Sequence, residues 1–121
     1  MIAMLREMFI GKLHGATVTD SRLDYRGSIT VDEDLLDAAG ILVHQRVQVL
    51  DIDNGQRFET YTIPGERGSG VVIINGAAAR LVQAGDKVII IAYGLLNDAE
   101  IAAHQPTVVI MGPGNTVSDT L

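Results

Sequence analysis

A Gly-Ser bond at positions 27 and 28 is a place in this sequence where the residue types allow covalent chemistry. A serine hydroxyl can attack the carbonyl carbon of the residue before it, which converts the peptide bond into an ester. The attack needs a strained peptide and an accessible carbonyl, and a preceding glycine supplies both conformational freedom and access. Taken alone, Gly27-Ser28 is equally compatible with an ordinary turn, so its meaning depends on the surrounding residues.

The composition predicts one β-rich domain covering residues 1–121, a length that suffices for a single core. Hydrophobic residues make up 47 % of the chain and aromatic residues only 4 %, with no Trp, so the core has to be built from aliphatic side chains. The β-branched runs at residues 71–74 and 88–91 are typical of strands that are buried on both faces.

Charge, cysteine and histidine content exclude several classes of function. Acidic side chains outnumber basic ones by 15 to 9, the opposite of what proteins that grip phosphate backbones show, so we expect no nucleic-acid partner. The chain has no Cys, and His14, His44 and His104 lack metal-ligand spacing, so we expect no disulfide and no metal site. His44 and His104 belong to no motif and are predicted to be surface residues.

The first ten residues resemble the start of a signal peptide, but Arg6 and Glu7 interrupt their apolar stretch. No run in the chain approaches the roughly 18 apolar residues that a membrane span requires. We therefore expect a cytoplasmic protein with no membrane partner.

The order of apolar runs and turn residues is typical of a small barrel of short strands. Asn54-Gly55 is the strongest hairpin signal, and Asp32 suits the N-cap of a short helix that Gly40 ends. Arg67, in an expected loop at residues 64–68, is assigned a structural role, and the tail from Gly112 onward is expected to fray. The expected strands cover residues 9–13, 16–19, 28–31, 47–53, 56–63, 71–74, 87–93 and 107–111, and the expected helices cover residues 33–39 and 97–104.

Five motifs, in one order along the chain, give the Gly27-Ser28 bond a specific meaning, and the first of them, at the amino-terminal end, has three parts. They lie at residues 11–14 (GKLH), 18–19 (VT), 23–28 (LDYRGS), 53–61 (DNGQRFETY), 65–70 (GERGSG), 75–79 (NGAAA) and 85–86 (GD). In order and spacing this set resembles bacterial aspartate 1-decarboxylase, a pyruvoyl-dependent family. The resemblance covers most of the chain, from about residue 8 to residue 111.

The resemblance implies a double-psi β-barrel that assembles as a homotetramer with active sites between subunits. The proenzyme is expected to cleave itself into a β-chain, residues 1–27, and an α-chain, residues 28–121. Ser28 then becomes a pyruvoyl group, which forms a Schiff base with L-aspartate and serves as the electron sink for loss of CO₂. The product is β-alanine for pantothenate and coenzyme A synthesis. Neither pyridoxal phosphate nor a metal is expected, and a maturation partner is not excluded.

Processing residues follow from the matched motifs. Thr60 resembles the family residue that hydrogen-bonds the carbonyl region of Gly27 during cleavage of the Gly27–Ser28 bond, an oxyanion-type role. Tyr25 is expected to shape the cleavage loop. His14 could position the processing site, although a purely structural hydrogen bond is an equal alternative for a lone histidine.

Three further residues are assigned to the substrate. Arg57 resembles the ligand of the carboxylate that aspartate keeps, which its bidentate fork suits. Lys12, one of only two lysines, is implied as a second electropositive group, and Tyr61 as the proton donor that completes decarboxylation. The alternatives are that Arg57 is a solvated strand residue, that Lys12 is an exposed edge-strand lysine, and that Tyr61 lies at the margin of the core.

The motif at residues 75–79 is implied to contact the reacting group. Asn75 would orient the pyruvoyl group or the imine, while Gly76, Ala77 and Ala78 would offer close backbone contacts; a plain turn is the alternative. Thr60 and Tyr61 are neighbours on one expected strand, so their side chains point to opposite faces. Both reach one site only if the strand is distorted or the site lies between subunits.

Two other functions stay open from the residues. A non-catalytic barrel that binds a ligand or a partner protein would explain the acidic surface, but it leaves Lys12, Ser28, Arg57, Thr60 and Tyr61 unexplained as a set. A decarboxylase for another acidic amino acid, such as glutamate, is the second, because an arginine recognises a carboxylate without measuring chain length.

Overall fold

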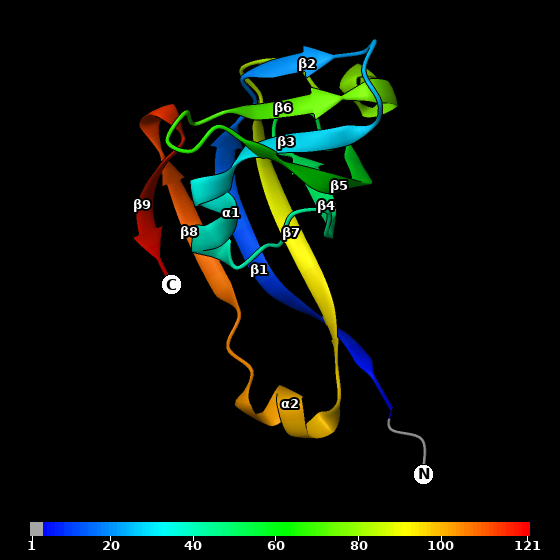
Figure 1. Ribbon diagram of the computed structural model, residues 1–121, viewed down its shortest axis with the longest axis vertical. Coiled ribbons are helices and arrows are strands. Elements are labelled where there is room, and N and C mark those ends of the chain that lie inside the picture. The colour runs from blue at the N-terminus through cyan, green and yellow to red at the C-terminus, as the bar shows by residue number, and fades with distance from the viewer. Residues whose placement is uncertain (1–3) are drawn as a thin grey trace.

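A computed structural model describes residues 4–121, in which nine strands form the body of the protein (Figure 1). The strands are β1 (Arg6–Thr17), β2 (Asp20–Arg22), β3 (Ser28–Asp32), β4 (Arg46–Asp51), β5 (Arg57–Gly65), β6 (Val72–Asn75), β7 (Lys87–Leu96), β8 (Thr107–Gly112) and β9 (Thr116–Thr120). The helices are α1 (Glu33–Ala39) and α2 (Asp98–Ala103), with 3-10 turns η1 (Gly76–Arg80) and η2 (Pro113–Asn115). Within these residues no helix combines the length and the hydropathy that crossing a bilayer requires.

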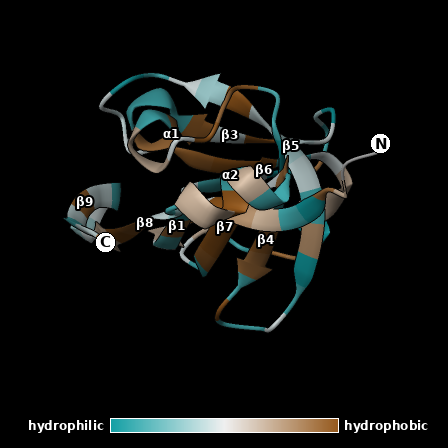
Figure 2. Ribbon diagram, turned by 90° about the horizontal axis from the view of Figure 1, so that it is seen from below, coloured by the Kyte–Doolittle hydropathy of each residue, from teal (hydrophilic) through white to brown (hydrophobic). Residues whose placement is uncertain are grey.

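The strands hydrogen-bond in the order β2-β6-β3-β5-β4-β7-β1-β8-β9. The pairs β2/β6, β3/β5 and β1/β8 are parallel and the others antiparallel, so the chain crosses repeatedly between strands that are not consecutive. Hydrophobic segments run along β3, β4 and β7 in Figure 2. Their inward side chains join those of β1, β6 and α1 in one aliphatic core. The mainly β, barrel-type fold with short helices that the sequence predicts is confirmed.

Helix α1 begins and ends as its capping residues predict. The Asp32 carboxylate accepts the backbone N–H of Asp34 at 2.8 Å, and Gly40 closes the helix at φ 70°. The same carboxylate accepts the N–H groups of Gly68 and Gly70 at 3.1 and 2.9 Å. Because Asp32 is only 3 % exposed, it ties α1 and the loop before β6 together as a buried anchor.

Arg67 holds the same loop from outside. Its guanidinium lies 2.7 Å from carboxylate oxygens of Asp34 and Asp37 and 3.1 Å from Glu33. The hydrogen bonds to Asp37 and Asp34 raise the pKa of Arg67. These contacts agree with the structural role expected for this arginine.

The hairpin at Asn54-Gly55 is present, with Gly55 at φ 78° between β4 and β5. The Asn54 side chain donates to the carbonyl of Leu81 at 2.8 Å, which fastens the hairpin to the turn before β7. Strand β5 continues through Pro64, where a loop was expected, because Val31 of β3 pairs with that position.

Two expectations about the chain ends are wrong. The predicted break between residues 13 and 16 is absent, since β1 runs continuously from Arg6 to Thr17 and absorbs its irregularities as register shifts against β7. The tail does not fray: β9 pairs with β8, and buried Asn115 bonds to the backbone of Thr17 and Gly70. The side chain of Asn115 supplies hydrogen bonds to segments that are distant in the sequence, which a polar, Gly-rich composition did not reveal.

His104 also differs from its expected surface position. Its side chain is half-buried, and Nε2 lies 2.9 Å from the carbonyl oxygen of Phe9. The contact joins the end of α2 to β1, whereas His44 is exposed as expected.

Candidate functional site

Ser28 begins β3 and is buried, with only 5 % of its surface exposed. It pairs with Asn75 at the end of β6, and the Asn75 amide donates to Ser28 Oγ at 3.1 Å and to Thr30 Oγ1 at 3.0 Å. Asn75 is itself 4 % exposed, so the serine hydroxyl is held by a buried side chain. Burial and a fixed donor distinguish Ser28 from an ordinary turn serine.

Gly76 brings η1 against the bond before Ser28. A Cβ at Gly76 would lie 2.6 Å from the Cα of Gly27, 2.7 Å from its nitrogen and 3.0 Å from the carbonyl oxygen of Tyr25. Only a glycine tolerates this approach, and φ at Gly76 is 80°. Asn75 and Gly76 of the 75–79 motif therefore contact the Gly27-Ser28 segment directly.

The loop between β2 and β3 carries the other residues near this bond. Tyr25 is 61 % exposed, and the guanidinium of Arg22 lies 5.4 Å from the centre of its ring. In η1, Ala77 is exposed, while Ala78 packs against the core and uses its carbonyl for a turn bond to Leu81 N–H.

Strand β5 passes beside Ser28. The parallel register pairs Ile29 with Thr62, and extending it by one residue sets Ser28 next to Tyr61. Thr60 is half-buried, whereas Tyr61 is 43 % exposed on the other face, as the strand alternation requires. Both line an open groove of about 430 Å³ together with His44, Arg46 and Glu59.

Lys12, His14 and Arg57 lie apart from this cluster. Arg57 starts β5, four positions before Tyr61, which is about 13 Å along an extended strand. Lys12 and His14 lie on β1, which β7, β4 and β5 separate from β3 in the sheet. Lys12 Nζ lies 6.0 Å from the Phe9 ring centre. No hydrogen bond or ion pair within residues 4–121 links these three side chains to Ser28.

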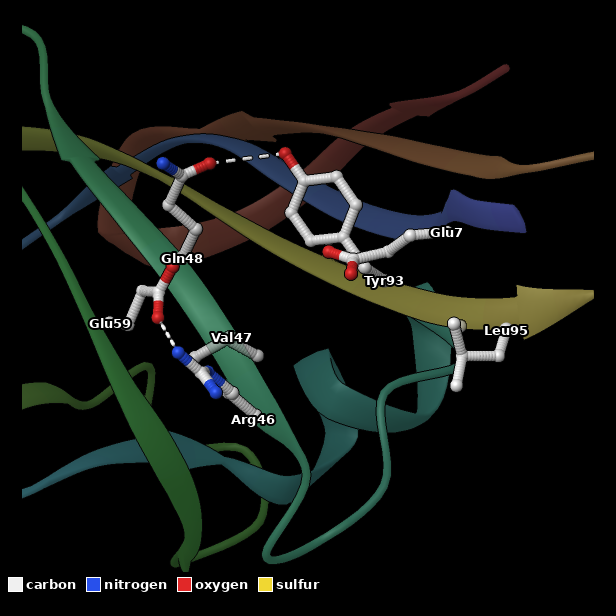
Figure 3. Close-up of a pocket in the computed structure, with 8 residues that line it drawn as sticks. Glu7, Arg46, Val47, Gln48, Glu59, Tyr93 and Leu95 are labelled. Carbon is white, nitrogen blue, oxygen red and sulfur yellow. Dashed lines mark hydrogen bonds and ion pairs between the residues drawn. The ribbon is translucent and has the colours of Figure 1, made fainter. Parts of the chain in front are cut away.

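A larger groove of about 560 Å³ adjoins the first one (Figure 3). Arg46 and Glu59 form an ion pair and line both grooves, and the Tyr93 hydroxyl hydrogen-bonds the side-chain oxygen of Gln48 at 3.1 Å. The groove is lined by Glu7, Arg46, Val47, Gln48, Glu59, Tyr93, Gly94 and Leu95. None of the residues to which the sequence assigns a chemical role lies here, although Glu59 belongs to the motif at residues 53–61. Arg46 carries no local signal that could have identified it.

The chain is similar over nearly its full length to proteins of known family. A family model described as aspartate decarboxylase matches residues 4–118. Aspartate 1-decarboxylases of Bacillus velezensis and Neisseria meningitidis are 57 % and 58 % identical over 118 residues, which cover 98 % of this chain and 93 % of each relative. The enzyme of Heliobacterium modesticaldum is 57 % identical over 114 residues, 94 % of this chain and 86 % of the relative. With Ser28, Asn75 and Gly76 gathered around one bond, the chain belongs to the aspartate decarboxylase family.

Proposed function

We propose that this protein cleaves itself between Gly27 and Ser28 and uses the pyruvoyl group formed from Ser28 to convert L-aspartate into β-alanine and CO₂. The observation that carries the proposal is the hydrogen bond from Asn75 to Ser28 Oγ, together with the close packing of Gly76 on Gly27. Aspartate as substrate is supported by relatives that bear the name aspartate 1-decarboxylase.

Cleavage begins when Ser28 Oγ attacks the Gly27 carbonyl carbon. The C–N bond breaks, the nitrogen of residue 28 takes up a proton, and an ester joins the two residues. Loss of the Cα proton of residue 28 then expels the Gly27 carboxylate, and the resulting dehydroalanine hydrolyses to a pyruvoyl group with release of ammonia. Asn75 orients the hydroxyl for the attack, and Thr60, on the strand beside β3, is proposed to stabilise the oxyanion.

Burial of Ser28 fits the group that would form there. A ketone at this position supplies an electron-withdrawing carbonyl that accepts the electron pair left when CO₂ departs. Burial of residue 28 excludes most water from that carbonyl and so protects it, and Asn75 remains beside it as a hydrogen-bond donor. Gly76, Ala77 and Ala78 are proposed to line the substrate position with backbone.

Arg57, Lys12 and Tyr61 carry the second step in this proposal. Arg57 binds the retained carboxylate of aspartate through its planar fork, and Lys12 adds positive charge. Tyr61 returns a proton to the α-carbon. Tyr25 and His14 serve the processing loop.

The separation of Ser28 from Lys12 and Arg57 within one chain supports an active site completed by a second subunit. We propose a homotetramer in which β1 and the start of β5 of one subunit supply positive charge to Ser28 of its neighbour. We further propose that the enzyme acts in the cytoplasm and that its product feeds pantothenate and coenzyme A synthesis.

Intact mass of the purified full chain tests the proposal. Two fragments meeting at residue 28 are expected, the second with its amino terminus blocked by a keto group. Ser28→Ala should stay full length and release no CO₂ from aspartate, whereas Arg57→Ala should cleave normally and lose turnover. CO₂ release by Ser28→Ala would show that the mechanism is wrong.

Two further measurements separate the alternatives. Equal turnover of glutamate would overturn the assignment of aspartate as substrate. A chain that stays intact and inactive, both alone and after incubation with a lysate of its source cells to supply any maturation partner, would favour a non-catalytic barrel.

A further inference from the structure

Three aspartates from two separate turns meet at one end of β4 and β7. Asp51 ends β4, Asp53 lies in the following hairpin, and Asp86 precedes β7. One carboxylate oxygen from each lies within 4.8 Å of the others. Asp51 is only 2 % exposed, and its Oδ2 has no hydrogen-bond donor among the described residues.

Backbone N–H groups hold the other oxygens of these carboxylates. Asp51 Oδ1 accepts from the N–H groups of Asp53 and Asn54 at 2.8 and 3.2 Å. Asp53 Oδ2 accepts from the N–H of Lys87 at 2.7 Å, and Asp86 Oδ2 from Gln83 N–H at 3.1 Å. Each carboxylate is therefore fixed in place while keeping a second oxygen available.

Among residues 4–121, no lysine or arginine forms an ion pair with the three aspartates. The ion pairs found within residues 4–121 involve other carboxylates, and the ammonium of adjacent Lys87 donates to Thr17 Oγ1 at 2.6 Å instead. Three carboxylates therefore meet at this end of β4 with no ion-pair partner among the described residues.

We propose that Asp51, Asp53 and Asp86 bind a hard divalent cation, Ca²⁺ or Mg²⁺. Such ions prefer carboxylate oxygens and complete their coordination with water, which the exposed side of Asp53 admits. The cation would partner the buried Oδ2 of Asp51 and bridge the β4–β5 hairpin to the turn before β7. The three ligands escape a search for His and Cys spacing because they come from turns that are far apart in the sequence.

Cation binding is measured on the full chain after treatment with EDTA and dialysis. Calorimetric titration with CaCl₂ alone or MgCl₂ alone should show saturable binding of one ion per chain. At millimolar concentration the preferred ion should raise the Tm by at least about 3 °C over NaCl of equal ionic strength. Neither readout depends on self-cleavage or on decarboxylation, so the result stands apart from the proposed enzymatic function.

Asp51→Asn and Asp86→Asn should abolish both the binding heat and the Tm increase. Asp119→Asn, which removes the same charge from exposed β9, should retain both. If Asp51→Asn does not fold, Asp86→Asn, whose side chain is less buried, decides the question. Absence of saturable binding for both ions, or unchanged binding in the folded Asp51→Asn or Asp86→Asn protein, would overturn the proposal.

Discussion

Replacing Gly76 with alanine perturbs the contact that supports the Gly27-Ser28 bond, where we propose that the chain cleaves itself. The new Cβ would lie 2.6 Å from the Cα of Gly27, and ordinary contact begins at 3.4 Å, so the two segments have to separate by at least about 0.8 Å. Both contacting groups are backbone, so no side-chain rotation relieves the overlap. Misplacement of reacting atoms by about 1 Å costs roughly 100-fold in rate, so we expect cleavage to slow by at least about tenfold.

A time course of intact mass on freshly expressed protein measures the cleavage rate, with circular dichroism to confirm folding. Gly55→Ala is the matched control, because φ at Gly55 is 78° and a Cβ there meets nothing within 4 Å. Both variants carry the cost of a left-handed alanine, about 1–2 kcal/mol. Only Gly76→Ala should add a cleavage defect.

Two outcomes refute this reasoning. If folded Gly76→Ala cleaves at the rate of the parent protein, the contact with Gly27 does not position the bond. If Gly55→Ala slows cleavage equally, backbone strain or lower stability accounts for the effect, and the steric argument fails.

Three further predictions concern stability. Asn115→Ala should lower the free energy of unfolding by about 3 kcal/mol in urea titrations, because it leaves backbone groups of Thr17 and Gly70 without partners; an effect below about 1 kcal/mol would mean that the tail does not anchor the barrel. Arg67→Ala should lower the Tm at low salt, and the difference should shrink in high salt, because the ion pairs of Arg67 are exposed and screened; a salt-independent loss would point to packing. In EDTA, Asp51→Asn should raise the Tm at neutral pH and lose this advantage as the pH falls. Burial, together with the neighbouring Asp86, raises the pKa of Asp51, so ionisation of this carboxyl group destabilises the folded state. That loss of stability disappears once the carboxyl group is protonated at lower pH. A Tm difference that does not change with pH would contradict this assignment.

Local features of the fold could be predicted from the sequence because the bonds that create them span only a few residues. Asp32 and Gly40 bracket α1, and Asn54-Gly55 turns the hairpin, since cap and turn geometry depend on single side chains and on φ. The aliphatic runs predicted the strands buried in the core. The ordered motifs also predicted the family, which the match over residues 4–118 confirms.

Features that depend on pairing between distant segments could not be predicted from the residues. The tail forms β9 because Asn115 reaches Thr17 and Gly70, bonds that composition does not reveal. Arg46 and Glu59 line both grooves only because β4 and β5 pair in one register.

The same division applies to the candidate site. The sequence by itself determined which residues are available for the chemistry, including the Gly27-Ser28 pair, Asn75 and Arg57, and their roles stay predictions. Tertiary structure decided that Asn75 binds Ser28 and Gly76 packs on Gly27, while Lys12 and Arg57 lie elsewhere in the same chain. The physical reason is that sheet register sets which distant side chains meet, and register is a property of the whole packed core.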